Sequence, residues 1–361
     1  MAPAPIRFAV IGLGDIAQRA VLPAFDHARS RASLTALVSG TPKKRRVLGR
    51  RFADVISCGY KDYDALLASG AVDAVYIALP NEMHADFAHR AMEAGVHVLC
   101  EKPMATTVAD ARAMRRAAER TGVQFMVAYR LHFDPATLQA IAAARDRRAG
   151  ELRLMASVFS SPVERGDIRL TREGRGGLFD LGIYCVNAAR MVFRSEPIDV
   201  VAMHAGQGRG RFREVPEMTA ALLRYPGERM ATFVCSLNAW RNSSWTAVSR
   251  KRQVWLEPAY TYRDPFVMEI RSDSGTRSRR FGVHDQFAAE LDHFVARIRS
   301  GRKAEPSVRE GEADIRILDA IDRSARTGRR VRLQGIPRDA HPSPRQARAH
   351  PPVGQVRLVD G

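Results

Sequence analysis

The sequence predicts an α/β protein with an N-terminal doubly wound parallel sheet and a C-terminal α+β domain built on a large, open, mostly antiparallel sheet. Up to about residue 130, short apolar runs alternate with helical patterns, as in a parallel sheet covered by helices on both faces. From residue 151 onward the apolar runs become longer and partly alternate with polar residues, which is typical of an antiparallel sheet. We place the domains at residues 1–130 and 131–335.

The N-terminal domain begins with an apolar run, Ile6–Ile11, followed by a glycine-containing turn and a helical stretch over Asp15–His27. A second apolar run, Leu34–Val38, completes a β-α-β unit with the spacing of a dinucleotide-binding crossover. The same reasoning predicts later strands at Ala74–Leu79, His97–Cys100 and Gln124–Val127, and helices at Lys43–Phe52, Asp62–Ser69, His84–Glu93 and Val108–Thr121.

The C-terminal domain contains a helical segment, Gly177–Phe193, that we expect to begin near Asp180. Two late helices, Asp285–Ser300 and Arg309–Thr327, are expected to close this domain. Residues 336–361 are rich in Pro, Arg and His with few apolar residues, which predicts a disordered basic tail. Strands are expected at Leu154–Ser160, Asp199–His204, Met218–Arg224, Met230–Leu237 and Gln253–Glu257.

Composition excludes several classes of protein. The apolar runs have strand length, far short of the roughly 20 residues that cross a bilayer, so no membrane association is expected. A strand and a turn are reached by Gly12, which leaves no room for an export signal. The four cysteines are far apart and form no C-x-x-C pair, which predicts reduced thiols, no metal site and a cytoplasmic protein.

The formal net charge of +18 raises the alternative of a nucleic-acid partner. The basic residues, however, are spread over the whole chain, and no basic motif is interleaved with aromatic residues. Solvated helix faces explain this charge better. We therefore expect no nucleic-acid partner and a general preference for anionic ligands.

A G-x-G-x-x-A pattern lies between the first strand and the first helix. Gly12 allows the tight turn, Gly14 lets the backbone approach a pyrophosphate, and the small Ala17 permits close helix–strand packing. A purely structural turn is the alternative, but the strand before and the helix and strand after favour a dinucleotide site. The predicted cofactor-binding residues of this turn are Gly12, Leu13, Gly14, Asp15 and Ile16.

The end of the second predicted strand indicates which dinucleotide binds. NAD enzymes place Asp or Glu at this position to accept the ribose hydroxyls, whereas this chain has Ser39 followed by Gly40. The cluster Lys43–Arg46 adds positive charge suited to a 2′-phosphate. We therefore predict NADP, bound here by Ser39, Gly40 and Lys44, with an exposed basic helix face as the alternative.

The predicted chemistry begins at Lys102, which follows a strand at the carboxyl edge of the parallel sheet, where ligands of such folds bind. Oxidation of an alcohol needs a base for the hydroxyl proton, and a nearby ammonium favours the ionised form of a phenol. Tyr184 is the candidate phenol, and Asp180 lies on the same helix face four residues before it. The alternative is that Asp180 caps the helix and Tyr184 is a core residue.

Seven motifs, occurring in order, show that the chain resembles the Gfo/Idh/MocA oxidoreductases and, within that family, the glucose–fructose oxidoreductases. The resemblance extends from about Pro5 to Leu333. The motifs are Ala9-Val10-Ile11-Gly12-Leu13-Gly14, Ala36-Leu37-Val38-Ser39-Gly40, Asp73-Ala74-Val75-Tyr76-Ile77, Leu79-Pro80-Asn81, Cys100-Glu101-Lys102-Pro103-Met104-Ala105-Thr106, Tyr129-Arg130 and Asp180-Leu181-Gly182-Ile183-Tyr184.

The resemblance implies a Rossmann domain and a role for each catalytic residue: Tyr184 as acid/base, Lys102 as its electrostatic partner and Asp180 as a ligand of a substrate hydroxyl. It places Glu101 at the nicotinamide ribose and implies a cis Lys102–Pro103 bond. The open sheet is expected to pack against a second subunit, giving a homodimer or homotetramer. The other implied cofactor-site residues are Leu79, Pro80, Asn81, His84 and Arg130, with helix capping by His84 and a structural ion pair of Arg130 as alternatives.

Three functions remain open from the sequence. The first is an NADP-dependent oxidoreductase that converts an aldose to a lactone, with or without coupled reduction of a ketose. The second is a dehydrogenase for inositol, a dihydrodiol or another polyol, because loops that the motifs do not describe determine the substrate. The third is a non-catalytic NADP-binding regulator, against which the presence of both Lys102 and Tyr184 argues.

Overall fold

The computed structural model describes residues 3–52, 54–336 and 338–360. Its first sheet has six strands, all parallel, in the order β3-β2-β1-β4-β5-β6. The predicted parallel sheet is confirmed, and β3 is the one strand that the sequence did not indicate. The strands are β1 (Ile6–Ile11), β2 (Ala32–Val38), β3 (Ile56–Cys58), β4 (Ala74–Ile77), β5 (His97–Glu101) and β6 (Phe125–Ala128).

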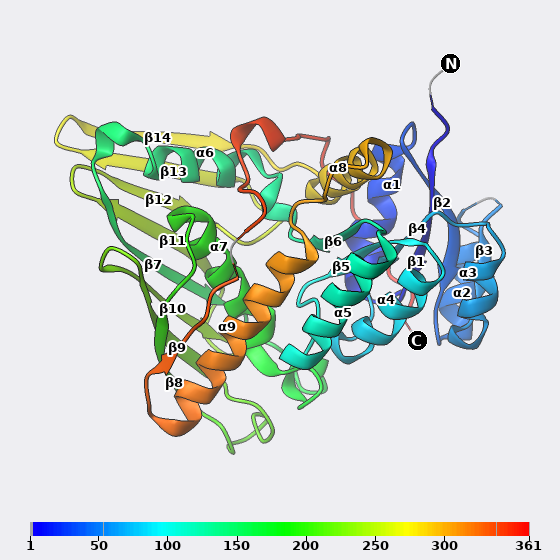
Figure 1. Ribbon diagram of the computed structural model, residues 1–361, viewed down its shortest axis with the longest axis horizontal. Helices are drawn as coiled ribbons and strands as arrows, with labels where there is room; N and C mark the ends of the chain where they lie inside the picture. The colour runs from blue at the N-terminus through cyan, green and yellow to red at the C-terminus, as the bar shows by residue number, and fades with distance from the viewer. Residues whose placement is uncertain (1–2, 53, 337, 361) are drawn as a thin grey trace.

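Helices cover both faces of this sheet (Figure 1). One face packs against α3 (Tyr63–Ala68), α4 (His84–Glu93) and α5 (Val108–Thr121). The opposite face packs against α1 (Leu22–Ala28) and the late helix α8 (Gln286–Ser300). The expectation that α8 closes the C-terminal domain was therefore wrong: its apolar residues join the core of the N-terminal domain, where the ring of Phe294 lies 6.2 Å from that of Phe8.

The second sheet has nine strands in the order β14-β13-β12-β11-β7-β10-β9-β8-β15. The pair β7–β10 is parallel and all other neighbouring pairs are antiparallel, which confirms the predicted mostly antiparallel sheet. The strands are β7 (Leu152–Ser160), β8 (Asp199–Ala205), β9 (Met218–Tyr225), β10 (Arg229–Ser236), β11 (Asn242–Ser249), β12 (Gln253–Glu257), β13 (Phe266–Ser272), β14 (Gly275–Phe281) and β15 (Val331–Arg332).

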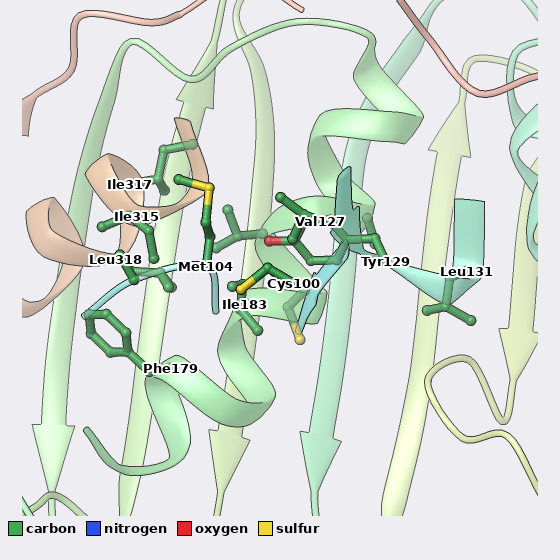
Figure 2. Packing of buried hydrophobic residues seen from close by; sticks show 14 of the residues in the cluster. Cys100, Met104, Val127, Tyr129, Leu131, Phe179, Ile183, Ile315, Ile317 and Leu318 are labelled. Atoms are coloured by element: carbon green, nitrogen blue, oxygen red, sulfur yellow. The ribbon is translucent and has the colours of Figure 1, made fainter. Parts of the chain in front are cut away.

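Helices lie on one face of the second sheet, and the other face is open (Figure 1). The covering helices are α6 (Pro135–Ala144), α7 (Ile183–Phe193) and α9 (Val308–Thr327). One apolar cluster joins α9 and α7 to the end of the first sheet, as Figure 2 shows for Met104, Val127, Ile183 and Leu318. The two sheets therefore share a core. This core fixes the loops at the carboxyl end of the first sheet relative to the second sheet.

The C-terminal segment differs from the disordered tail that its composition predicts. Arg338 is buried against Glu310 at 2.6 Å, and Val359 is 8% exposed in the core of the N-terminal domain. Isolated apolar and charged residues in this segment find partners that are distant in the sequence, which composition alone does not reveal. Among the described residues, no helix is both long enough and apolar enough to cross a membrane.

Candidate active site

A cavity of about 600 Å³ lies where the carboxyl ends of the first sheet face the second domain. Ten of the predicted site residues line it: Asp15, Ile16, Leu79, Asn81, His84, Glu101, Lys102, Arg130, Asp180 and Tyr184. The others, namely Gly12, Leu13, Gly14, Ser39, Gly40, Lys44 and Pro80, lie outside its lining. The structure thus gathers the predicted catalytic residues in one chamber and leaves the glycine-rich turn and the end of β2 beside it.

The glycine-rich turn has the shape that a dinucleotide requires. Gly12 has a φ of +94°, and a Cβ there would lie 2.4 Å from the carbonyl oxygen of Ala78. No side chain fits at that position. At Gly14 a Cβ would meet no atom within 4 Å, so the backbone faces open space that a pyrophosphate can enter. The following helix begins with a wide π-helical turn, Ala17–Val21, a feature frequent at functional sites.

The end of β2 carries no carboxylate that would exclude a 2′-phosphate. Ser39 is buried, and its hydroxyl accepts a hydrogen bond from the Thr41 amide at 3.2 Å. Helix α2 (Pro42–Gly49) starts directly afterwards and has no acidic residue in its first turn. Its N-terminus, together with Lys44, offers donors and positive charge to an anion. Arg45 is engaged elsewhere, since its guanidinium donates to the Ser39 carbonyl at 2.7 Å.

Lys102 and Asp180 form an ion pair at the centre of the cavity wall. The Lys102 ammonium donates to Oδ1 of Asp180 at 2.9 Å and to the Asp180 carbonyl at 3.1 Å. Burial by itself would lower the pKa of Lys102, but Asp180, Tyr184 and Glu101 together outweigh burial and raise the pKa to about 12. Burial likewise opposes ionisation of Asp180, but Lys102 and Arg169 hold its pKa at about 2. Both groups are therefore charged at neutral pH.

Tyr184 lies one helical turn beyond Asp180 and points into the same chamber. A π-helical turn, Leu178–Gly182, leads into α7 and presents both side chains to the cavity. The Tyr184 hydroxyl accepts a hydrogen bond from Arg130 at 3.3 Å, and the Lys102 ammonium lies 4.6 Å from the centre of its ring. Two cationic side chains, Arg130 and Lys102, therefore lie beside the phenol.

Glu101, at the end of β5, lines the cavity and is largely buried. Its carboxylate accepts hydrogen bonds from the Tyr76 hydroxyl at 2.9 Å and from the Lys102 amide at 3.2 Å. Burial raises the pKa of Glu101 above its ordinary value, although Lys102 acts in the opposite direction. The next peptide bond, Lys102–Pro103, is cis, as the resemblance implied.

His84 connects two loops of the site and does not cap its helix. Its Nδ1 lies 2.9 Å from the Pro103 carbonyl and its Nε2 lies 2.9 Å from the Leu79 carbonyl. Burial lowers its pKa, so the ring is neutral at pH 7 and donates to one of the two oxygens. Helix α4 has no side-chain cap. His84 therefore fixes the loop after β4 to the turn that carries Lys102.

Arg130 makes contacts that the sequence did not predict. Instead of an ion pair, its guanidinium has neutral partners: the carbonyls of Tyr260 and Thr261 and the side-chain oxygen of Gln286. These hydrogen-bond partners carry no charge, and the guanidinium lies beside Tyr184. Burial of such a charge requires several hydrogen bonds, which the three fixed oxygens supply.

The sequence did not predict several of the residues that line the cavity. Arg169, in the short helical turn Ile168–Leu170, donates to Oδ2 of Asp180 at 3.2 Å and also pairs with Asp167 at 2.6 Å. No motif marks these residues, because irregular loops bring them to the site. The remaining lining residues that we missed include Phe159, Ser161, Arg241, Tyr260, Tyr262, Arg263 and Asp264.

A Rossmann-type sheet, a glycine-rich turn and a lysine–tyrosine pair in one chamber define an oxidoreductase of two domains. The profile described as "Oxidoreductase family, NAD-binding Rossmann fold" matches residues 6–129, and that of the "GFO/IDH/MocA C-terminal domain" matches residues 137–254. The chain therefore belongs to the Gfo/Idh/MocA oxidoreductase family, which confirms the resemblance.

Individual relatives match nearly the whole chain. The crystal structure of an aldose-aldose oxidoreductase from Caulobacter crescentus, complexed with glycerol, is 33% identical with a TM-score of 0.86 and covers 91% of this chain and 100% of its own. A 3-ketoreductase from Actinomadura kijaniata, in complex with NADP and TDP-benzene, is 28% identical with a TM-score of 0.81, over 89% and 98% of the two chains. D-xylose 1-dehydrogenase [NADP(+)] from Haloarcula marismortui is 28% identical over 91% and 93%.

Proposed function

We propose that this protein is an NADP-dependent oxidoreductase that transfers hydride between nicotinamide and a CH–OH group of a sugar, oxidising an aldose to a lactone. The observation that carries this proposal is the grouping of Lys102, Asp180 and Tyr184 in the cavity beside the glycine-rich turn. The names of the relatives support sugars as substrates, since they include a xylose dehydrogenase, an aldose-aldose oxidoreductase and a reductase of dTDP-linked sugars.

Three features support NADP as the cofactor. Ser39 replaces the carboxylate that would repel a 2′-phosphate, and α2 offers its N-terminus at that point. Lys44 adds a cation in the first turn of α2. The names of two relatives include NADP. When bound, NADP supplies the acceptor or donor of hydride.

The residues of this chain handle the proton and the substrate hydroxyls. The Tyr184 side chain, as phenolate, would take the proton of the reacting hydroxyl while hydride leaves the carbon for the nicotinamide, and Arg130 and Lys102 beside it favour that form. The ionised Asp180 accepts a hydrogen bond from a second hydroxyl of the sugar. Because Lys102 and Arg169 both contact Asp180, its two oxygens are held in fixed orientation.

The proposal is tested by following absorbance of reduced nicotinamide while the purified protein and NADP are mixed in turn with aldoses, inositol and other polyols. Reduction of NADP by one or more aldoses is expected. Turnover with polyols alone would show that the protein is a polyol dehydrogenase and that its substrate is not an aldose. Absence of nucleotide binding would reject the proposal as a whole.

A second candidate reaction couples oxidation of one sugar to reduction of another. The aldose-aldose oxidoreductase among the similar structures favours it. Such coupling requires that the nucleotide stay bound between the two half-reactions. Mass spectrometry of nucleotide released from denatured protein, purified without added NADP, distinguishes the two: retained NADP supports coupling, and empty protein supports an ordinary dehydrogenase.

We further propose that the protein is a homodimer or homotetramer that pairs through the open face of its second sheet. A continuous row crosses six strands of that face, and it comprises Val201, Leu222, Thr232, Ala156, Thr246 and Trp255. Adjacent apolar side chains are exposed, including Met203 at 72% and Leu154 at 45%. Exposed apolar areas of this kind mark interfaces. Sedimentation should give a dimer or tetramer, and Thr232→Arg should shift it toward the monomer.

The cytoplasm is the location that we propose from the cysteines. All four thiols, Cys58, Cys100, Cys185 and Cys235, are free. Buried free thiols are typical of reducing compartments. Fractionation of the source cells with a specific antibody tests this, and recovery outside the cytoplasm would contradict it.

A further inference from the structure

The last part of the C-terminal segment, residues 348–360, crosses the N-terminal domain along α8. The Arg348 amide donates to the Phe133 carbonyl at 3.1 Å, and the Asp285 amide donates to the His350 carbonyl at 3.1 Å. The His350 ring lies 3.0 Å from an oxygen of Asp292. These contacts anchor the start of the segment, and they direct the residues that follow toward the glycine-rich turn.

One buried amide joins the end of this segment to the turn. The Gln18 side chain donates to the Leu13 carbonyl at 3.0 Å and to the Val359 carbonyl at 3.1 Å. Its oxygen accepts a hydrogen bond from the Val359 amide at 2.8 Å. Leu13 is the residue between Gly12 and Gly14. The segment is therefore two hydrogen bonds away from the backbone that faces the open space at Gly14.

The amide of Gln18 depends on the segment for most of its partners. The side chain is 3% exposed, and an amide has two N–H donors and one carbonyl acceptor. Without Val359, one donor and the carbonyl would be left unpaired. Because unpaired buried polar groups are costly, Gln18 would then rotate or admit water, and its bond to Leu13 would be weakened.

The middle of the segment lines a second cavity that lies next to the active-site cavity. Residues 353–356 form one wall of a second cavity of about 390 Å³. That cavity and the active-site cavity have three lining residues in common: Tyr262, Arg263 and Phe287. The segment therefore lines a cavity that adjoins the active-site cavity, in addition to its hydrogen bonds with Gln18.

We propose that residues 351–360 contribute to the binding of NADP. Through Gln18 they position the glycine-rich turn, and this positioning determines the affinity for NADP. This inference rests on the proposed NADP dependence. Gln18 is a positioning residue, because it acts through Leu13 and the backbone of the turn. The expected signature is a change in nucleotide affinity, and in KM for NADP, without a matching change in kcat.

The test compares three variants by fluorescence titration with NADPH. A chain that stops after His350 loses Arg357 and Asp360, whose charges cancel, so the net side-chain charge is unchanged. Gln18→Met keeps the length of the side chain and removes all three hydrogen bonds. Arg357→Ala is the control, because its exposed side chain is removed while the backbone stays. We expect the first two variants to raise the Kd for NADPH about tenfold, and the control to leave it within about twofold.

The combined variant, truncated and Gln18→Met, should bind NADPH like the truncated chain, because both changes break the same connection. Additive effects would overturn the inference, as would an unchanged Kd in either single variant. If the truncated chain does not fold, Gln18→Met and Val359→Pro, which removes the amide donor to Gln18, decide in its place. Failure of the unaltered protein to bind NADPH would reject the proposed function, whereas normal binding by every variant would reject only this inference.

Discussion

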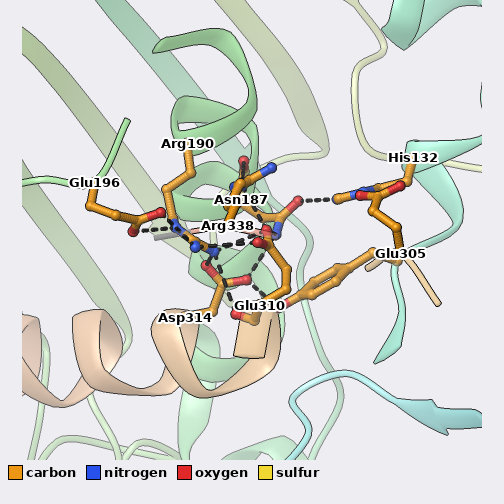
Figure 3. Close-up of polar contacts among 9 residues, drawn as sticks. His132, Asn187, Arg190, Glu196, Glu305, Glu310, Asp314 and Arg338 are labelled. Atoms are coloured by element: carbon orange, nitrogen blue, oxygen red, sulfur yellow. Dashed lines mark hydrogen bonds and ion pairs between the residues drawn. The ribbon is translucent and has the colours of Figure 1, made fainter. Parts of the chain in front are cut away.

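Two clusters of buried charge lie along one helical segment of this protein, and they differ in what surrounds them. At its start, Asp180 and Tyr184 face Lys102 across the active-site cavity. Near the other end, Arg190 lies between Glu196 and two acidic side chains of α9 (Figure 3). The same helix therefore supplies a reactive site and a structural network, and the difference shows how one can be told from the other.

In the structural network, the charged groups are paired with other side chains of the protein. Arg190 is fully buried and forms ion pairs with Glu196 at 2.8 Å, Glu310 at 2.9 Å and Asp314 at 2.7 Å. Asp314 also accepts hydrogen bonds from Tyr129 at 2.6 Å and from Asn187 at 2.8 Å, the latter seen in Figure 3. These groups are buried and paired with one another, whereas Tyr184 lines the cavity, so the network holds helices together.

The groups of the active-site cluster, by comparison, have fewer hydrogen-bond partners within the protein. Arg130 is the one hydrogen-bond partner of the Tyr184 hydroxyl among the described residues, and the Asp180 side chain is 26% exposed to the cavity. Charges and hydroxyls that keep bonding capacity toward a cavity can bind a ligand. We therefore expect changes in the first cluster to alter catalysis and changes in the second to alter stability.

The largest expected effect is that of Tyr184→Phe on the chemical step. Removing the hydroxyl removes the proton acceptor, so kcat should fall by about 10²–10⁴-fold. The melting temperature and the Kd for NADPH should stay close to those of the unaltered protein. Steady-state kinetics and calorimetry on the same sample provide both readouts. A kcat within threefold of the original would remove Tyr184 from the mechanism.

Arg190→Met should give the opposite pattern. It leaves Asp314 without its cationic partner in a fully buried place, and breaking a buried pair in this way costs about 3–5 kcal/mol of unfolding free energy. Urea denaturation measures this loss. The kcat per folded molecule should not change. Glu196→Gln, at the more exposed side of Arg190, is the matched control with a smaller loss; equal losses would contradict the comparison.

The ion pair of the active site predicts a flat pH dependence over a wide window. Because the pKa of Asp180 is lowered from 3.8 to about 2, its contribution to stability is complete above pH 3.8 and is lost as the pH falls through 2. The pKa of Lys102 is raised from 10.5 to about 12, so its contribution is complete below pH 10.5 and is lost as the pH rises through 12.

The difference in unfolding free energy between the original protein and the double variant Asp180→Asn/Lys102→Met, which lacks both groups, should therefore be constant between about pH 4 and pH 10. Denaturant titrations at three pH values in this window measure it. A difference that grows or shrinks by more than about 1 kcal/mol would show that one of the two groups titrates inside the window.

The smallest expected effect concerns the end of β2. Ser39→Asp places a carboxylate where we expect the 2′-phosphate, which should shift the ratio of NADP to NAD affinity toward NAD by about tenfold or more. Titration with both reduced nucleotides measures the ratio. If it does not move, the phosphate is recognised elsewhere, and Lys44→Ala is the next variant to examine.

The sequence predicted the parts of the protein that repeat a physical pattern. Strand β1 and helices α4 and α5 have the boundaries expected from their apolar periodicity and flanking glycines. Lys102, Asp180 and Tyr184 do come together, because the carboxyl edge of a parallel sheet and one helix face constrain where they lie. Both sheets followed from how apolar residues alternate.

What the sequence did not reveal depends on tertiary contacts. Strand β14 (Gly275–Phe281) is almost fully exposed, so it has no apolar pattern. Arg169 and the neutral partners of Arg130 reach the site from irregular loops. The C-terminal segment owes its order to partners such as Gln18, which is 341 residues from Val359. Such pairings leave no local signal in composition or spacing.

The role of Tyr184 is tested most directly by a single-turnover experiment on three proteins in parallel: the original chain, Tyr184→Phe and Arg190→Met. Each is mixed with NADP and an excess of the best aldose, and the rise of reduced-nicotinamide absorbance is recorded. We expect similar rates for the original chain and for folded Arg190→Met, and a rate lower by about 100-fold or more for Tyr184→Phe. Equal rates for the original chain and Tyr184→Phe would contradict it.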